Sequence, residues 1–328
     1  MEVEIRMKIL VTGGMGLIGH HVVSKLEQLQ HDVVIVDTQT NYGIIPQEEV
    51  NYLVSERKKK IKTYQNFKFD ICSAGNIEWL FAANKFDIVI HMASFPRQKV
   101  VNANPILGSR VMSEGLLNLC EMSKKNNVKK FVYISSSMVY GDFTDDVTED
   151  YNCKPQGQYG ILKLTGEHLV KDYTRRGCFN HTIIRPSAVY GPLDVEDRVI
   201  AKFMLTAMRG ATLKVNGAGE TLDFTYVEDA AEGIVAASLS SNTDNKTYNI
   251  TKSHSRSLLD AAQLAVEIVG KGSIEVRDKD ADFPSRGALN IDAARRDFGY
   301  DPKVDVEEGF QKYYEWLSTS SYWQDKIK

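Results

Sequence analysis

The sequence predicts an α/β fold in which a doubly wound parallel sheet is joined to a smaller C-terminal lobe. In the first half, short β-branched and apolar runs alternate with amphipathic helical patterns, which is typical of parallel strands linked by crossover helices. After residue 185 this alternation loosens and turn-rich stretches such as 216–219 appear. The 328 residues suffice for two units of about 150 residues each. We expect a first domain over 1–185 and a second lobe over 186–328, partly interleaved with the first.

The expected elements follow from these periodicities. Strands are expected at 8–11, 33–36, 68–70, 88–91, 130–135 and 182–185. Helices are expected at 18–29, 77–84, 107–126 and 159–176, and in the second lobe at 228–240, 258–269 and 306–317. Residues 38–63 are too many for a simple loop, so we interpret them as an insertion with a helix at 46–60. Its basic run at 57–60 suits a solvated helix C-terminus, where cations favour the helix dipole.

Composition and charge exclude several classes of partner. Lys and Arg number 40 against 43 Asp and Glu, a net charge of −3, so no positive excess is available to neutralise a nucleic acid. No run approaches 18 uninterrupted apolar residues, which disfavours a membrane span, and the N-terminus lacks the apolar core of a secretory signal. The four cysteines form no CxxC pair, so we expect no metal site. The composition favours a cytoplasmic globular protein.

A glycine-rich turn follows the first expected strand. Gly13, Gly14, Gly16 and Gly19 lie between that strand and the first helix. Glycines permit a tight turn close to a pyrophosphate, and the N–H groups and dipole of the following helix attract the anion. Asp37 ends the second strand 18 residues after Gly19, where a carboxylate accepts hydrogen bonds from a ribose. This order predicts a Rossmann-type dinucleotide site, and the absence of Arg from 38–40 favours NAD over NADP.

A second group of residues indicates acid–base chemistry. Ser135, Ser136 and Ser137 directly follow an apolar strand, and Tyr159 and Lys163 follow further along the chain. Residues four apart on a helix share one face, so the ammonium can lie near the phenol. A nearby cation lowers the pKa of a phenol from about 10 and allows the phenolate to act as a general base. A pair with the same spacing occurs near the C-terminus at 322 and 326, and we interpret it as a chance match.

Together these motifs resemble the extended short-chain dehydrogenase/reductase family, in particular its NAD-dependent nucleotide-sugar epimerase/dehydratase group. The resemblance covers about 7–317 and includes further matches at 70–71, 91–94, 185–192, 223–229 and 298–302. It implies an NAD-binding first domain and a substrate-binding second lobe. It assigns Tyr159 and Lys163 to catalysis and to the nicotinamide ribose, and Ser136 to the catalytic hydroxyl, with Ser135 and Ser137 left open. The cofactor residues it implies are Gly13, Gly16, Leu17, Ile18, Gly19, Asp37, Asp70, Ile71, Met92, Ala93, Ser94, Tyr159 and Lys163.

Departures from the family pattern bear on the reaction. Similar 4,6-dehydratases carry an Asp-Glu pair after the catalytic hydroxyl, whereas this chain has Ser137 and Met138. A thioether cannot transfer a proton, so dehydration is disfavoured. The resemblance then implies a nucleotide-sugar epimerase that moves hydride reversibly at one carbon through a keto sugar. A nucleotide-sugar dehydrogenase or keto-sugar reductase on the same scaffold remains the alternative, and a protein that only binds the dinucleotide is disfavoured because the catalytic side chains are intact.

Further departures bear on the substrate and on assembly. Ala188 and Leu222 replace the Asn and Arg that many relatives use for the substrate phosphates. We therefore expect other residues to bind the nucleotide sugar, namely Arg286 first, then Arg198, Arg97 and Ser137. The helices at 107–126 and 159–176 carry apolar residues in more directions than one sheet-facing stripe needs. The resemblance implies that they form a four-helix bundle in a homodimer, and the alternative is that the surplus packs against the second lobe.

Overall fold

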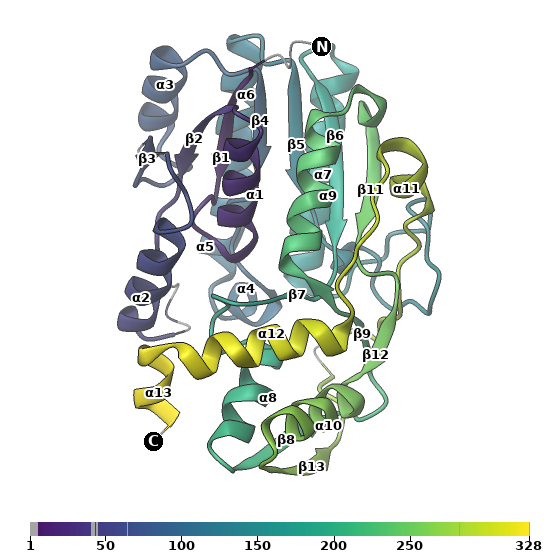
Figure 1. The fold of residues 1–328 in the computed structure, drawn as a ribbon. Coiled ribbons are helices and arrows are strands. Elements are labelled where there is room, and N and C mark those ends of the chain that lie inside the picture. The colour runs from purple at the N-terminus through teal and green to yellow at the C-terminus, as the bar shows by residue number, and fades with distance from the viewer. Residues whose placement is uncertain (1–5, 41–42, 44, 64, 282, 328) are drawn as a thin grey trace.

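A parallel sheet of seven strands forms the centre of the molecule. The computed structural model describes the chain except for residues 1–5, 41–42, 44, 64, 282 and 328. The strand order is β11-β6-β5-β4-β1-β2-β3, and neighbouring strands run parallel (Figure 1). The strands are β1 (Lys8–Thr12), β2 (Asp32–Val36), β3 (Asn66–Phe67), β4 (Ile88–His91), β5 (Lys130–Ile134), β6 (Asn180–Pro186) and β11 (Lys246–Ile250). The predicted doubly wound α/β fold is confirmed.

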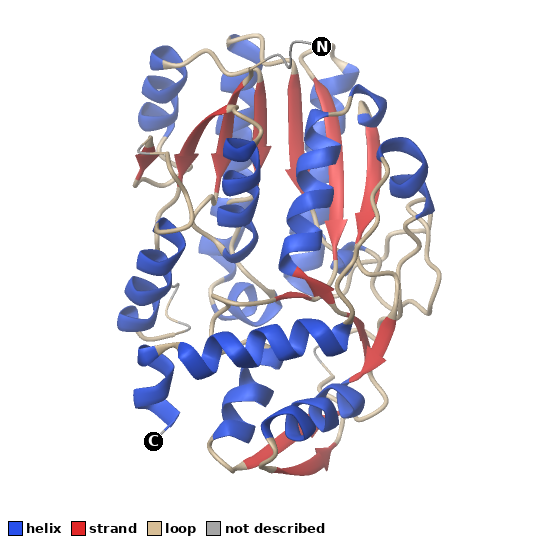
Figure 2. Ribbon diagram, viewed as in Figure 1, coloured by secondary structure: helices blue, strands red, loops and turns tan. Residues whose placement is uncertain are grey.

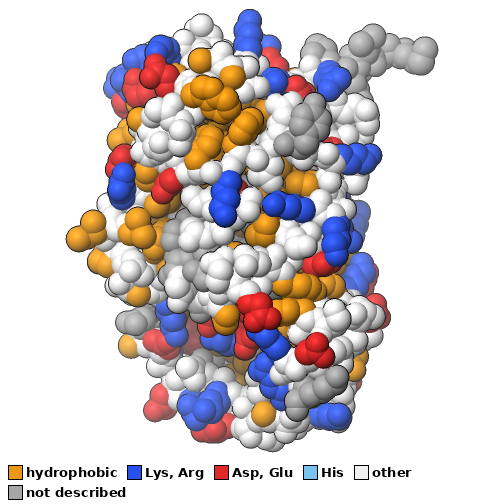
Figure 3. Space-filling view, turned by 90° about the vertical axis from the view of Figure 1, so that its left-hand side faces the viewer, with side chains coloured by type: hydrophobic (Ala, Val, Ile, Leu, Met, Phe, Trp, Pro, Cys, Tyr) orange, Lys and Arg blue, Asp and Glu red, His pale blue; other side chains and the backbone are white. Residues whose placement is uncertain are grey.

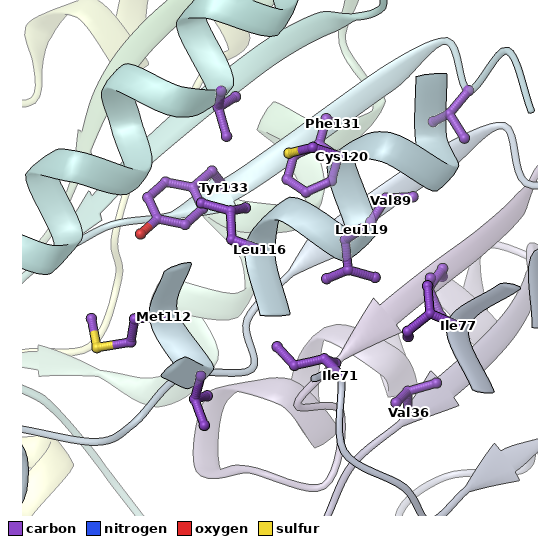
Figure 4. Packing of buried hydrophobic residues seen from close by; sticks show 14 of the residues in the cluster. Val36, Ile71, Ile77, Val89, Met112, Leu116, Leu119, Cys120, Phe131 and Tyr133 are labelled. Carbon is purple, nitrogen blue, oxygen red and sulfur yellow. The ribbon is translucent and has the colours of Figure 1, made fainter. Parts of the chain in front are cut away.

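Helices cover both faces of the sheet, so its central strands are buried on both sides. On one face lie α3 (Ala74–Ala83), α6 (Gly115–Lys125) and α7 (Gly157–Arg175), with α4 (Gln98–Ala103) and α5 (Pro105–Ser109) near its lower end. Figure 4 shows how Leu116 and Leu119 of α6 pack beside Val89 and Phe131 of the sheet. On the other face lie α1 (Leu17–Gln28), α9 (Val227–Leu239) and α11 (Asp292–Phe298). Double coverage explains why the strands read as continuous apolar runs.

The second lobe lies below the carboxyl ends of the strands and has its own apolar core (Figure 2). Its helices are α8 (Val199–Met208), α10 (Leu258–Val269), α12 (Val306–Thr319) and α13 (Ser321–Ile327). Its short strands pair as β7 (Val189–Tyr190) with β10 (Thr225–Tyr226), β8 (Thr212–Asn216) with β13 (Ser273–Arg277), and β9 (Thr221–Asp223) with β12 (Ser255–Ser257). Among the described residues, no helix is long and apolar enough to cross a bilayer.

Two predicted elements differ from the structure. The strand expected at 68–70 begins two residues earlier, because β3 pairs with Ile35 and Val36 of β2. Asp70 instead begins a turn, in which its carboxylate accepts the Cys72 N–H at 2.8 Å. The single helix expected over 107–126 is divided by a π-helix, Arg110–Glu114, between α5 and α6. A β-carbon on Gly115 would lie 2.6 Å from the Ile71 side chain, so this stretch approaches the 70–71 turn very closely.

The insertion forms α2 (Gln47–Lys58), as predicted, but its basic run is not uniformly solvated. Lys58, Lys59 and Lys60 are exposed, whereas the Arg57 side chain is only 7% exposed. The solvated interpretation is therefore wrong for Arg57. The helical spacing explains the difference, because Arg57 shares one face with the buried Val50, Leu53 and Val54. Figure 3, which looks onto the edge that carries α2, α3 and β3, shows apolar groups gathered among charged ones.

Candidate active site

One large cavity lies at the carboxyl ends of the strands, between the sheet and the second lobe. Its volume is about 1070 Å³. Ligands of open α/β sheets bind in this position, where the strand order reverses direction. The cavity brings together the residues that the sequence assigned to catalysis, to the cofactor and to the substrate. These are Gly13, Gly16, Leu17, Ile18, Gly19, Asp37, Asp70, Ile71, Met92, Ala93, Ser94, Arg97, Ser136, Ser137, Tyr159, Lys163, Arg198 and Arg286.

The glycine-rich turn between β1 and α1 is too tight for side chains. Gly13 has φ +73°, and a β-carbon there would lie 2.7 Å from the Ala93 nitrogen. A β-carbon on Gly19 would lie 2.2 Å from the Gly13 carbonyl oxygen. Gly16 precedes the first turn of α1, and Gly13, Gly16 and Gly19 line the cavity without side chains. This arrangement fits a pyrophosphate, which binds to the free N–H groups and dipole at a helix N-terminus.

Asp37 lies half-buried just beyond β2. Its carboxylate accepts the N–H of Met15 at 2.9 Å and the N–H of Gln39 at 2.7 Å. Burial raises the pKa of Asp37, and these two hydrogen bonds oppose that shift. Two carboxylate oxygens can accept about four hydrogen bonds, so acceptor capacity remains for ribose hydroxyls. The geometry thus fits an adenosine ribose at this end of the cavity.

Tyr159 and Lys163 lie one turn apart on α7 and both face the cavity. The ammonium of Lys163 lies 5.9 Å from the Tyr159 ring centroid and donates to the Ile134 carbonyl oxygen at 2.7 Å. Burial lowers the pKa of Lys163 to about 7, and the negative charge of Glu167 opposes this shift. Burial raises the pKa of Tyr159, while a hydrogen bond with the Ser136 hydroxyl and the charge of Arg198 lower it.

The three adjacent serines after β5 point in different directions. Ser135 donates to Glu167 Oε1 at 2.6 Å, and Ser137 donates to the Ser187 hydroxyl at 3.2 Å. Ser136 caps the 3₁₀ helix Ser137–Val139 by accepting the Met138 N–H at 3.2 Å, and its hydroxyl bonds to Tyr159. Of the three, Ser136 is therefore the serine that shares a hydrogen bond with the phenol.

A buried ion pair behind this group was missed at the sequence level. Glu167 lies one turn beyond Lys163 on α7 and has no exposed surface. Arg185 at the end of β6 donates to both of its carboxylate oxygens, at 2.9 and 2.7 Å. The spacing of Tyr159, Lys163 and Glu167 by four residues each was the available signal. The Glu167 carboxylate of this ion pair lies near Lys163 and also accepts the hydrogen bond from the Ser135 hydroxyl.

The arginines on the other side of the cavity differ in their partners. Arg97 donates to the backbone carbonyl and the carboxylate of Asp197, and Arg198 lies 3.7 Å from the Asp194 carboxylate. Arg286 has a buried Nε without a hydrogen-bond partner among the described residues. Burial lowers the pKa of Arg286 to about 10, and the positive charge of Arg198 acts in the same direction. Two guanidinium groups that repel each other inside one cavity form a suitable site for an anion.

Arg57 was not predicted to belong to the site, yet it also lines the cavity. The charge of Arg57 acts on Asp37, so an arginine does lie near the expected ribose position, although it comes from α2 and not from 38–40. Both of its terminal nitrogens already donate to backbone carbonyl groups, those of Met15 and Leu193. These two bonds hold the guanidinium between the two turns, while its Nε is buried without a hydrogen-bond partner among the described residues. Its position on the apolar face of α2 was the signal that could have revealed it.

Known proteins resemble this chain over nearly its whole length. An uncharacterized UDP-glucose epimerase of Bacillus subtilis is 28% identical over 95% of this chain and 98% of its own length. The dTDP-glucose 4,6-dehydratase 1 of Escherichia coli is 30% identical over 98% of this chain and 96% of its own. The structure of UDP-glucuronic acid 4-epimerase from Bacillus cereus, in complex with UDP-glucuronic acid and NAD, matches with a TM-score of 0.86 and 27% identity, over 95% of this chain and 99% of that one.

The model of the NAD dependent epimerase/dehydratase family matches residues 9–251, which is most of the chain. The resemblance inferred from the sequence motifs is confirmed, as is the expectation of NAD as the cofactor. The cavity agrees with this assignment, because the glycine-rich turn, Asp37 and the Tyr159–Lys163 pair all line it. The chain is therefore an NAD-dependent enzyme of the epimerase/dehydratase family.

Proposed function

We propose that the protein is a nucleotide-sugar epimerase that oxidises and re-reduces one sugar carbon through a keto sugar. The observation that carries this proposal is the pair of residues after Ser136. Ser137 and Met138 both line the cavity, and neither can act as the acid or base that eliminates water. NAD, when bound, supplies the hydride acceptor and donor, and it is regenerated within one cycle. The chemistry left to this chain is proton transfer at one hydroxyl.

Tyr159 is the general base in this proposal. Its phenol oxygen takes the proton of the reacting sugar hydroxyl, and it returns that proton when the keto group is reduced. Ser136 is bonded to the phenol and can hold the same sugar oxygen. Lys163, in its charged form, stabilises the phenolate from one side, and Arg198 adds positive charge from the substrate side.

The remaining lining residues are proposed to bind the two ligands. Arg286 and Arg198 would hold the substrate diphosphate, because an anion between them relieves their repulsion and satisfies the buried Arg286 Nε. Arg97 and Ser137 would contact the sugar side. The NAD contacts would come from the glycine-rich turn, from Asp37 at the adenosine ribose, and from the two loops that follow β3 and β4. The residues concerned are Gly13, Gly16, Leu17, Ile18, Gly19, Asp70, Ile71, Met92, Ala93 and Ser94.

Product analysis tests the proposed reaction. The protein is incubated without oxygen with UDP-, GDP-, CDP- and dTDP-sugars, and products are analysed by mass spectrometry and NMR, with the Tyr159→Phe variant as background control. An epimerase gives unchanged mass and an inverted centre. Loss of water overturns the proposal in favour of a dehydratase, the activity named for one relative. Loss of two hydrogens identifies a dehydrogenase instead.

We also propose a homodimer built on α5, α6 and α7. Leu107, Leu117 and Ile161 on these helices are 43%, 37% and 50% exposed, although all three are large and apolar. Helices that pack with the same helices of a second copy form an isologous, closed interface. Leu117→Glu should convert a dimer to a monomer in sedimentation, whereas Val276→Glu, at an exposed apolar residue of β13, should not. A parent protein that is monomeric at micromolar concentration contradicts the proposal.

A further inference from the structure

Helix α2 of the insertion forms one wall of the cavity at the end where Asp37 lies. Val50, Leu53, Val54 and Arg57 on one face of this helix all line the cavity. The helix is also held by the C-terminal region, because the Tyr52 hydroxyl bonds at 2.6 Å to the hydroxyl of Ser320, which follows α12. The insertion is thus packed between the first domain and the C-terminal helices rather than extended into solvent.

Arg57 joins two turns that are more than 170 residues apart. One terminal nitrogen donates to the Met15 carbonyl oxygen at 2.9 Å, and the other donates to the Leu193 carbonyl oxygen at 2.5 Å. Both peptide groups of Met15 are therefore held, the carbonyl oxygen by Arg57 and the N–H by the Asp37 carboxylate. This fixes the orientation of the glycine-rich turn that lines the cavity.

The second turn is held in an unfavourable conformation. Leu193 has φ +70°, a left-handed conformation that residues with a β-carbon rarely adopt and that persists only where neighbouring contacts impose it. Its carbonyl oxygen accepts the Arg57 bond, and the next residue, Asp194, interacts with Arg198 at 3.7 Å. Glu49, also on α2, accepts the Glu196 N–H at 2.7 Å. Helix α2 therefore supports the segment that presents Arg198 to the cavity.

The charge of Arg57 is balanced locally. Asp194, Asp37 and Glu49 surround it, and their negative charges favour its charged form against the effect of burial. The buried guanidinium is held directly by its two bonds to carbonyl groups, so it acts as a connection between the two turns and not as a solvated charge. If either turn moved away from α2, the buried guanidinium would lose one of these bonds.

We propose that Arg57 is a positioning residue that ties the NAD-binding turn to the substrate segment 193–198, and that α2 thereby retains NAD between catalytic cycles. The proposal rests on the proposed function only in taking NAD and a nucleotide sugar as the ligands of this cavity. It explains how a cofactor that is regenerated in place stays bound. It also predicts that a single side chain affects both ligands.

The test compares Arg57→Met with Lys58→Met, a matched control at the neighbouring exposed position. Bound NAD labelled in its adenine is allowed to exchange with unlabelled NAD, without any sugar present, and KM and kcat are then measured. For Arg57→Met we expect exchange about tenfold faster and a KM for the nucleotide sugar raised by about the same factor, a larger change than the fall in kcat. Lys58→Met should stay within about twofold of the parent.

An Arg57→Met protein that is folded, as judged by its thermal unfolding, but whose exchange rate and KM both match the parent overturns the inference. If Arg57→Met does not fold, Arg57→Lys decides, because it keeps the charge among the carboxylates but cannot reach both carbonyl groups. It should exchange NAD faster than the parent, and parent-like exchange overturns the inference. The reaction type is judged separately from products, so a dehydratase with Arg57-dependent exchange would refute the proposed function and leave this inference standing.

Discussion

The two sides of the cavity are built in different ways. On the sheet side, Tyr159 and Lys163 lie within the long helix α7, and Ser136 lies two residues after a buried strand. On the lobe side, Arg97 and Arg286 lie in loops, and Arg198 immediately precedes α8. Groups on packed helices and strands hold a fixed geometry, whereas loops tolerate substitution. The comparison suggests that the sheet side determines which reaction occurs and the lobe side determines which substrate is bound.

The largest expected effect is on the sheet side. Tyr159→Phe removes only the ionisable oxygen, so it should lower kcat by about 10²- to 10⁴-fold while the fold and NAD binding are retained. Tyr322→Phe is the matched control, because Tyr322 and Lys326 have the same spacing on α13 but lie outside the cavity lining. Turnover of Tyr159→Phe within about tenfold of the parent would place the base elsewhere.

Cofactor preference should show the next largest effect. The Asp37 carboxylate would repel a 2′-phosphate at close range, and Arg57 is already bonded to two carbonyl groups. We expect NAD to bind about a hundredfold more tightly than NADP to the protein freed of cofactor, measured by calorimetry. Asp37→Asn should reduce this ratio, and equal affinities in the parent would refute the assignment of Asp37.

Substitutions on the lobe side should change substrate affinity more than turnover. Arg286→Met should raise KM by about tenfold or more and lower kcat much less, because a charge-assisted contact to the substrate is lost in both ground and transition states. Arg175→Met, an exposed position on α7, serves as the control. If Arg286→Met instead lowers kcat as strongly as Tyr159→Phe, the division between the two sides fails.

The smallest expected effect is a shift in pH dependence. Burial lowers the pKa of Lys163 to about 7, and the negative charge of Glu167 opposes this shift. Glu167→Gln should therefore lower the pKa of Lys163 further, and the loss of activity at alkaline pH should begin at a lower pH. Lys163→Met should act on the other limb, because without the cation Tyr159 ionises at higher pH, and NAD should bind more weakly. Asp172→Asn, at a half-buried position of α7, is the control. Unchanged pH profiles would remove both residues from the acid–base chemistry.

Sequence patterns predicted the sheet side well because its signals are local. The glycine-rich turn depends on backbone conformation, and the pairing of Tyr159 with Lys163 depends on helical periodicity. By contrast, the burial of Arg57 and the Arg185–Glu167 pair depend on contacts between distant segments. The π-helix at Arg110–Glu114 and the early position of β3 likewise follow from tertiary packing. The helical spacing of Arg57 with Val50 and Val54 indicates that the three side chains share one face, but the adjoining lysines favoured the interpretation of a solvated helix end.

The last strand of the sheet restricts how such an enzyme can acquire a new specificity. The chain leaves the sheet after β6, forms α8 and β8 in the second lobe, and then returns through α9 to β11 at the sheet edge. A fragment that ends at residue 185 would lack β11 and expose β6 as an unpaired edge, a template for aggregation. Replacement of the whole lobe by recombination would require more than two coordinated crossovers, because the chain returns to the sheet in α9 and β11 and again in α11. Gradual change at single positions of the cavity lining, such as those of Ala188 and Leu222, is the simpler evolutionary route.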